Sequence, residues 1–268
     1  MDLRNSTCLT LGSIERMQRK PMPECTLVLI SNKQEVYMGF LESLDTQKEV
    51  RYQLICIDNY AGEFAGTREA YNAYLAKAQS DWIIFLHPDI RFEDPYALRD
   101  ILSEVNQLGE FGVAGVAGCL KGEKWGILSD MLHGKDRMYA GERLVRSMEV
   151  QTLNECLFVM SKKYVIDHPF SDIVGWHLAC VEQCLEALVS GKRNYVIPSR
   201  LWHLSAGDSL DPDYLRILEI LIDKYAGEFD YFNTTVKQWQ VHGAAAKIYR
   251  KYYRMKQILK RRLRRYFK

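Results

Sequence analysis

The 268-residue chain lacks several features that mark whole classes of protein. No stretch approaches about 18 consecutive apolar residues, so we expect no transmembrane helix. The first 24 residues lack the apolar core of a secretory signal. The seven cysteines are scattered without a Cys-x-x-Cys pair, which excludes a zinc knuckle and a thioredoxin-type site. A reduced, cytoplasmic protein is therefore expected.

What the chain does have is an average globular composition. Hydrophobic residues make up 47% and charged residues 26%, which is enough to build a sizeable core. Intrinsic disorder, collagen-like repeats and a small disulfide-stapled scaffold are excluded by the same figures. We predict an N-terminal extension over residues 1–24, one main α/β domain over 25–232 and a helical C-terminal tail over 233–268.

Charge is divided unevenly along the chain. The formal net charge is +2, from 36 basic and 34 acidic residues. Residues 247–268 hold 11 Lys or Arg and no acid, which leaves 25 basic and 34 acidic residues elsewhere. A nucleic-acid enzyme is usually basic across its body as well, so a nucleic-acid partner is not expected.

The basic tail also carries an apolar stripe. Its members recur every three or four residues: Ile248, Tyr252, Met255, Leu259, Leu263 and Phe267. On a helix they form one face flanked by Lys and Arg, which is typical of a helix lying in the plane of a membrane surface. We predict a peripheral protein at the inner face of the cell membrane, bound to anionic lipid. The alternative is a helix that packs on the body or on a second copy in a homodimer.

The first half of the chain alternates strand and helix. Apolar runs predict strands over 25–31, 52–57, 82–86 and 111–117, with helices over 35–44, 67–79 and 96–107 between them. This alternation predicts a mostly parallel sheet with crossover helices. Ligands bind such sheets outside the carboxyl ends of the strands. At their carboxyl ends the first three predicted strands are followed by Ser31-Asn32, Asp58-Asn59 and His87-Pro88-Asp89, and we expect these polar residues to line one crevice.

The second half is less regular. Residues 121–141 are rich in Gly, Lys and Asp and predict a long functional loop. Further elements are predicted as strands over 143–150, 155–161 and 195–197, and as helices over 177–190 and 214–225.

One carboxylate stands out from the residues alone. Asp89 follows a buried strand of five apolar residues, where it could hold a divalent cation against a diphosphate. His203 follows a later strand-like run, and an imidazole ligand would favour Mn²⁺ over Mg²⁺. Taken singly, each residue is more often a turn or packing residue. Cys180, Cys184 and His177 lack a fourth ligand for zinc.

In the order of its motifs the chain resembles the GT-A glycosyltransferases, specifically the family-2-like inverting enzymes of bacteria. The resemblance spans roughly residues 25–207. In the first half of the chain the matching segments are Leu29-Ile30-Ser31-Asn32, Ile57-Asp58-Asn59, Tyr71-Asn72-Ala73-Tyr74 and the strand ending in His87-Pro88-Asp89. Further along they are the glycine-containing segment 112–118, the segment 150–157, Gly175-Trp176-His177 and Cys184-Leu185-Glu186-Ala187. A subgroup of that superfamily has His-x-Asp in place of Asp-x-Asp, as this chain does.

The resemblance implies a set of donor-site residues. It matches Asp89 and His203 to a site for Mn²⁺ or Mg²⁺, with His87 in the place of the motif's first acid. Asp58 matches the acid that contacts the base or the ribose of the nucleotide. Ser31 lies at the position where the first strand of the family's sheet meets the nucleotide. Finally, the resemblance matches Asn72 to a helix residue that braces the strand carrying Asp89.

The catalytic base departs from the family pattern. Family-2 enzymes usually carry Glu-Asp-x-Asp at the start of the catalytic helix, and here only Glu182 matches, while Cys180 takes the place of the base. Glu182, Asp172 and His177 remain candidates, since a base needs a pKa near the working pH. Trp176 could stack on a sugar, and Glu155 could contact the donor sugar or the acceptor.

The expected function is metal-dependent, inverting transfer of a sugar from a UDP- or dTDP-sugar. The expected acceptor is a lipid-linked glycan or a cell-surface polysaccharide, which would explain the basic tail. A degenerate fold that binds a sugar nucleotide or a partner without turnover is one alternative. A nucleotidyltransferase is another, although Ser31-Asn32-Lys33-Gln34 lacks the Gly-rich basic loop that such enzymes carry after the first strand.

Overall fold

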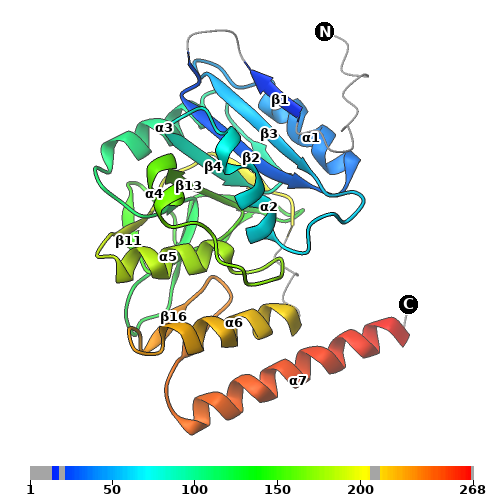
Figure 1. Ribbon diagram of the computed structural model, residues 1–268, viewed down its shortest axis with the longest axis vertical. Coiled ribbons are helices and arrows are strands. Elements are labelled where there is room, and N and C mark those ends of the chain that lie inside the picture. Colours follow the sequence, from blue (N-terminus) through cyan, green and yellow to red (C-terminus); the bar gives the residue numbers. More distant parts are fainter. Residues whose placement is uncertain (1–13, 18–21, 206–211, 267–268) are drawn as a thin grey trace.

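A computed structural model describes residues 14–17, 22–205 and 212–266 (Figure 1). Its centre is an eight-stranded sheet of order β1-β3-β2-β4-β13-β6-β14-β11. The strands are β1 (Ile14–Met17), β2 (Cys25–Ser31), β3 (Tyr52–Asp58), β4 (Trp82–Leu86), β6 (Ala114–Gly115), β11 (Met148–Val150), β13 (Leu157–Ser161) and β14 (Asn194–Val196). The pairings make β2, β3, β4, β6 and β14 point one way, and β1, β11 and β13 the other.

Helices cover both faces of this sheet, as the unbroken apolar runs of its central strands require. They are α1 (Gln34–Leu44), α2 (Thr67–Tyr74), α3 (Ala97–Gln107), α4 (Lys162–Asp167) and α5 (Ala179–Val189). One core joins α1 and α3 to Leu27, Leu29 and Leu54. The other joins α2, α4 and α5 to Val28, Ile55 and Phe85. The predicted α/β class is confirmed, and β2 and β4 have the predicted bounds.

Two smaller sheets are built mainly from residues after α3, and one prediction for this part of the chain is wrong. Residues 121–141 are not a long loop, because they form β8 (Ile127–Ser129), β9 (Leu132–His133) and β10 (Met138–Tyr139). One sheet has the order β10-β9-β15-β5, with β5 (Ile90–Phe92) and β15 (Leu201–His203); the other is β12-β7-β8, with β12 (Thr152–Leu153) and β7 (Ala117–Cys119). Strands of two or three residues are too short to leave a period of two in the sequence.

The boundaries of other elements also differ from the prediction. The helix expected over 67–79 ends at Tyr74 and continues as a 3₁₀ turn, Leu75–Lys77. The strand expected over 111–117 is split into β6 and β7, and the strand expected over 143–150 begins only at Met148. End positions of elements depend on tertiary pairing, which local patterns do not contain.

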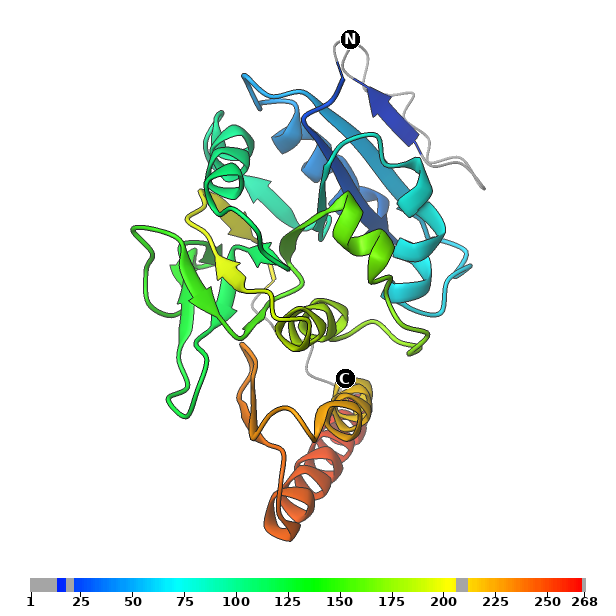
Figure 2. The same ribbon diagram turned by 60° about the vertical axis from the view of Figure 1, so that its left-hand side comes forward.

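The C-terminal part lies at one end of the molecule (Figure 2). It comprises α6 (Pro212–Tyr225), a hairpin of β16 (Tyr231–Asn233) and β17 (Gln238–Gln240), and α7 (Ala244–Tyr266). A third core joins α6 and the hairpin to the outer side of α5. The boundary expected between residues 232 and 233 falls inside β16. In the described residues no helix is long and apolar enough to span a membrane.

Candidate active site

The site begins at the carboxyl end of β4. The turn His87-Pro88-Asp89 joins β4 to β5, and β5 pairs with β15 so that His203 lies opposite Ile90. The amide of Leu204 donates to the carbonyl of Asp89 at 3.0 Å. This strand pairing is what brings His203 next to Asp89 across more than a hundred residues of sequence.

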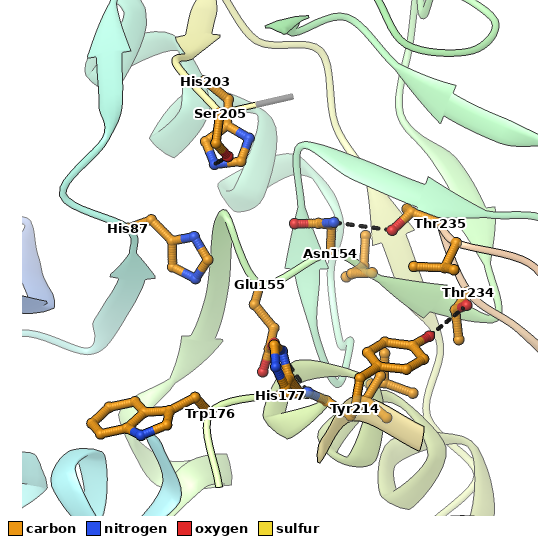
Figure 3. Close-up of a pocket in the computed structure, with 14 residues that line it drawn as sticks. His87, Asn154, Glu155, Trp176, His177, His203, Ser205, Tyr214, Thr234 and Thr235 are labelled. Carbon is orange, nitrogen blue, oxygen red and sulfur yellow. Dashed lines mark hydrogen bonds between the residues drawn. The ribbon is translucent and has the colours of Figure 1, made fainter. Parts of the chain in front are cut away.

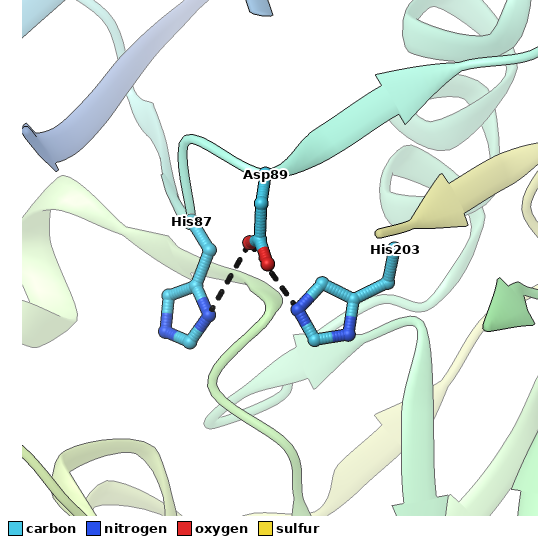
Figure 4. Close-up of side chains that lie close together, drawn as sticks. All are labelled: His87, Asp89 and His203. Atoms are coloured by element: carbon cyan, nitrogen blue, oxygen red, sulfur yellow. Dashed lines mark ion pairs between the residues drawn. The ribbon is translucent and has the colours of Figure 1, made fainter. Parts of the chain in front are cut away.

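His87, Asp89 and His203 form a compact cluster (Figure 4). Asp89 Oδ1 lies 3.3 Å from His203 Nε2 and 4.0 Å from His87 Nδ1, and one ligand atom from each residue lies within 4.8 Å of the others. Burial opposes ionisation of Asp89, but the hydrogen bond and charge of His203, together with His87, outweigh it and hold the pKa of Asp89 well below its usual range. The cluster therefore contains an ionised carboxylate between two imidazoles.

This donor set fits a divalent cation. A carboxylate oxygen suits Mg²⁺ and Mn²⁺ alike, and imidazole nitrogens favour Mn²⁺ of the two. Three protein ligands would leave coordination positions for phosphate oxygens or water. Within the described residues, this is the one group of His, Cys, Asp and Glu side chains spaced for a metal ion.

A cavity of about 300 Å³ opens beside the cluster (Figure 3). Its wall combines the loop before β13, the loop before α5, α6 and the β16–β17 hairpin. The polar and aromatic residues of the wall are His87, Asn154, Glu155, Trp176, His177, His203, Ser205, Tyr214, Thr234 and Thr235. Such a mixture of imidazole, carboxylate, amide and hydroxyl groups suits a polar ligand such as a sugar phosphate.

Glu155 holds the start of α5 in place. Its carboxylate accepts hydrogen bonds from the backbone amides of Leu178 at 3.0 Å, Ala179 at 2.5 Å and Cys180 at 3.3 Å. A carboxylate at a helix N-terminus satisfies the unpaired amides there and is favoured by the helix dipole. Glu155 thus fixes the segment that carries Trp176 and His177, and it lines the cavity as well.

The first two strand ends lie beside each other but outside this cavity wall. Ser31 and Asp58 are register partners at the carboxyl ends of β2 and β3. Ser31 Oγ lies 3.0 Å from the hydroxyl of Tyr60, whose amide donates to Asp58 at 2.9 Å. The two residues are therefore held at the sheet edge where β4 also ends, and their roles in nucleotide binding stay predictions.

Asn72 and Asp172 line a second, separate cavity of about 770 Å³ between α2 and residues 170–174. The side chain of Asn72 donates to the carbonyl of Phe170 at 2.7 Å and accepts from the amide of Phe170 at 3.1 Å. Asn72 therefore braces the loop that follows α4. Its expected roles in bracing the strand of Asp89 and in nucleotide binding stay predictions.

Glu182 lies in an ion-pair network behind the cavity. Its carboxylate contacts Arg68 at 2.7 Å, Lys224 at 2.9 Å and the hydroxyl of Ser171 at 2.9 Å. Burial opposes its charged form, but Arg68 and Lys224 outweigh this and lower the pKa of Glu182. Of the three candidate bases, only His177 lines the cavity beside the cluster.

Sequence reasoning missed two histidines, one in the cluster and one packed against it. His87 was matched to the motif's first acid but not predicted as a ligand. His133 lies opposite His203 on the parallel pair β9–β15, with ring centroids 5.5 Å apart. Burial, and then the charge of His203, lower the pKa of His133 to about 4. His133 lies in the segment predicted as a loop, so no pattern in the sequence identified it.

Comparisons with known proteins identify the family of the chain. A family model described as "Glycosyltransferase like family" matches residues 25–225. A curated protein of Fuscovulum blasticum, "ATP synthase subunits region ORF 6", is 24% identical over 184 residues, which cover 65% of this chain and 71% of that protein.

Solved structures are similar in fold. S. aureus TarS superposes with a TM-score of 0.53 at 12% identity, covering 75% of this chain but only 39% of TarS. The 1–349 portion of TarS in complex with UDP-GlcNAc gives a TM-score of 0.52, with 66% of that portion covered. The mannosyltransferase PcManGT from Pyrobaculum calidifontis, in complex with GDP-Man and Mn²⁺, gives 0.51 at 10% identity, covering 81% of this chain and 68% of PcManGT.

Proposed function

Because the chain belongs to the glycosyltransferase-like family, we propose that it transfers a sugar from a nucleoside-diphosphate sugar, with inversion, to a hydroxyl of a glycan or lipid-linked acceptor. Its fold is the GT-A fold predicted from the sequence. The observation that carries the proposal is the cluster of His87, Asp89 and His203 at the end of β4, open to a polar cavity.

The cluster is the proposed diphosphate site. Asp89 and His203, joined by His87, would hold Mn²⁺ or Mg²⁺, and the bound cation would offset negative charge on the leaving nucleoside diphosphate. PcManGT, of similar fold, is described with GDP-Man and Mn²⁺, and TarS 1–349 with UDP-GlcNAc. These descriptions support a UDP- or GDP-linked hexose as the donor, while the dTDP-sugar expected as an alternative rests on the sequence resemblance alone. Ser31 and Asp58, at the neighbouring strand ends, would contact the nucleoside.

His177 is the proposed base that takes the proton from the acceptor hydroxyl. It lines the same cavity as His87, whereas Glu182 is held by two cations and Asp172 faces the other cavity. Trp176, which is 41% exposed at the cavity wall, offers a flat surface on which a sugar ring could stack. A base positioned in this way contributes about 10²–10⁴-fold to the rate.

The test is donor turnover with Mn²⁺, scored as release of UDP or GDP from a panel of nucleotide sugars. Asp89→Asn removes the charged ligand and should lower turnover at least about a hundredfold. His177→Gln should lower it about 10²–10⁴-fold while leaving donor binding near that of the wild type. Asp130→Asn is the matched control, since this partly buried carboxylate pairs with Arg143 instead. Wild-type turnover by Asp89→Asn would overturn the proposal.

A second candidate is a sugar-nucleotide-binding protein without turnover. Cys180, in the family position of the base, is fully buried, and Glu182 is ion-paired, which favours this alternative. The same panel of nucleotide sugars distinguishes the binding protein from the transferase. A binding protein would show a rise in melting temperature with its donor but would release no nucleotide from any sugar of the panel.

A further inference from the structure

The C-terminal helix α7 presents an apolar face that nothing else in the described part of the chain covers. Its residues are between 52% and 68% exposed: Ile248, Tyr252, Met255, Leu259 and Leu263. At about 100° per residue they fall within about 80° of one another around the helix axis. Single exposed apolar residues are ordinary, but an aligned row of five is not. Phe267, the sixth residue of the predicted stripe, lies outside the described residues.

The body of the protein is attached to the opposite side of the helix. Arg250 is 5% exposed, and its Nε lies 2.9 Å from Glu219 of α6. The ring of Tyr253 packs edge-on against Trp239 of β17, with centroids 5.5 Å apart, and Ala246 is buried. Figures 1 and 2 show α7 running beside α6 at the edge of the molecule. The apolar stripe is therefore turned outward, and packing on the body does not account for it.

Basic residues border the stripe on both sides. Lys251 and Arg262 project on one side of it and Lys256 and Lys260 on the other, by their positions around the axis, and all four are exposed. Residues 247–268 contain 11 basic residues and no acid. A helix with an apolar face framed by cations can insert that face among acyl chains while its flanks contact anionic headgroups.

We propose that α7 docks the protein on the surface of an anionic lipid bilayer, lying in the membrane plane with the stripe inserted. A second copy fits this face less well, because two-fold pairing of identical stripes would set the same cationic borders against each other. Nucleic acid would contact the cations but leave five apolar side chains in water. The proposal stands apart from sugar transfer, since it uses none of the residues of the cluster or the cavity.

The experiment is flotation of the full-length protein with vesicles. Wild-type protein should float with vesicles of phosphatidylcholine and phosphatidylglycerol, float much less with phosphatidylcholine alone, and be released by high salt. The triple variant Tyr252→Ser, Met255→Ser, Leu259→Ser should lose at least about tenfold in affinity. Lys256→Gln with Lys260→Gln should lose about 25-fold in affinity, since each cation contributes about fivefold.

The matched control removes exposed apolar side chains elsewhere. Ile166→Ser with Val189→Ser alters residues that are 54% and 46% exposed on α4 and α5, and should bind vesicles as the wild type does. Unchanged vesicle binding by the triple variant would overturn the proposal. An absence of vesicle binding by the wild-type protein would also overturn it, including the case in which the triple variant loses a dimer or an RNA complex that the wild type forms. Thermal denaturation followed by circular dichroism shows that each variant is folded.

Discussion

At the residue scale, a buried charge can serve either chemistry or structure, and its partners decide which. Asp89 faces two imidazoles and lies 23% exposed beside an open cavity. Glu182 is 4% exposed and is shared by Arg68, which is itself buried, and by Lys224. A buried carboxylate neutralised by two cations is a structural link between α2, α5 and α6, and it lies outside the wall of the cavity that holds His177.

The change Glu182→Gln tests this structural role. It leaves Arg68 buried without a counter-charge, so the free energy of unfolding should fall by about 3 kcal/mol at pH 7. Because the folded state lowers the pKa of Glu182, its stabilising contribution is present above the unfolded pKa and is lost as the pH falls through the folded pKa. The difference in free energy of unfolding between Glu182→Gln and wild type should therefore narrow below about pH 4.

Urea denaturation at several pH values measures this difference. Glu63→Gln, a change at an exposed acid, is the control and should stay within about 0.5 kcal/mol of wild type. A Glu182→Gln protein of wild-type stability with abolished turnover would instead return Glu182 to the role of base.

At the element scale, the segment that carries Trp176 and His177 is positioned by close backbone contact with the start of α2. A Cβ atom on Gly66 would lie 2.5 Å from the backbone nitrogen and oxygen of Gly175. The amide of Thr67 also donates to the carbonyl of Gly175 at 3.0 Å. Glycine at position 66 is thus required by space, and the cavity wall depends on this contact.

Gly66→Ala should therefore disturb the site from a distance. We expect a loss of about 1–3 kcal/mol in the free energy of unfolding. We also expect donor turnover to fall by more than the unfolded fraction explains, since Trp176, the residue after Gly175, lines the cavity. Gly227→Ala is the control, because a Cβ there meets nothing within 4 Å. Thermal denaturation and turnover together check the prediction, and wild-type values for Gly66→Ala in both would contradict it.

The elements also show how far the sequence could predict the fold. The strands β2 and β4 were predictable because continuous apolar runs ending in polar residues carry their own boundaries. The strands β8, β9 and β10 were not, since they have only two or three residues each and are strands only through their pairing: β8 with the nearby β7, and β9 with the nearby β10 and the distant β15. His133 was missed for that reason. The meeting of His203 with Asp89 was expected only from the family resemblance, because the β5–β15 pairing leaves no local pattern.

At the scale of the whole molecule, the proposed chemistry and the proposed membrane contact occupy different parts of the chain. The cluster lies at the carboxyl end of β4, whereas the outward apolar stripe lies on α7, beyond the third core. The tail alone is strongly basic and the remainder is acidic overall. Charge would therefore favour approach to an anionic surface through α7 rather than through the body.

The central claim is that His87, Asp89 and His203 bind one divalent cation together with a nucleotide. The most direct measurement is electron paramagnetic resonance of free Mn²⁺ during titration with the protein and UDP or GDP. We predict one Mn²⁺ bound per wild-type chain, and an affinity at least about tenfold weaker in Asp89→Asn and in His203→Ala, with Asp130→Asn unchanged. Equal Mn²⁺ binding by wild type, Asp89→Asn and His203→Ala would contradict the account.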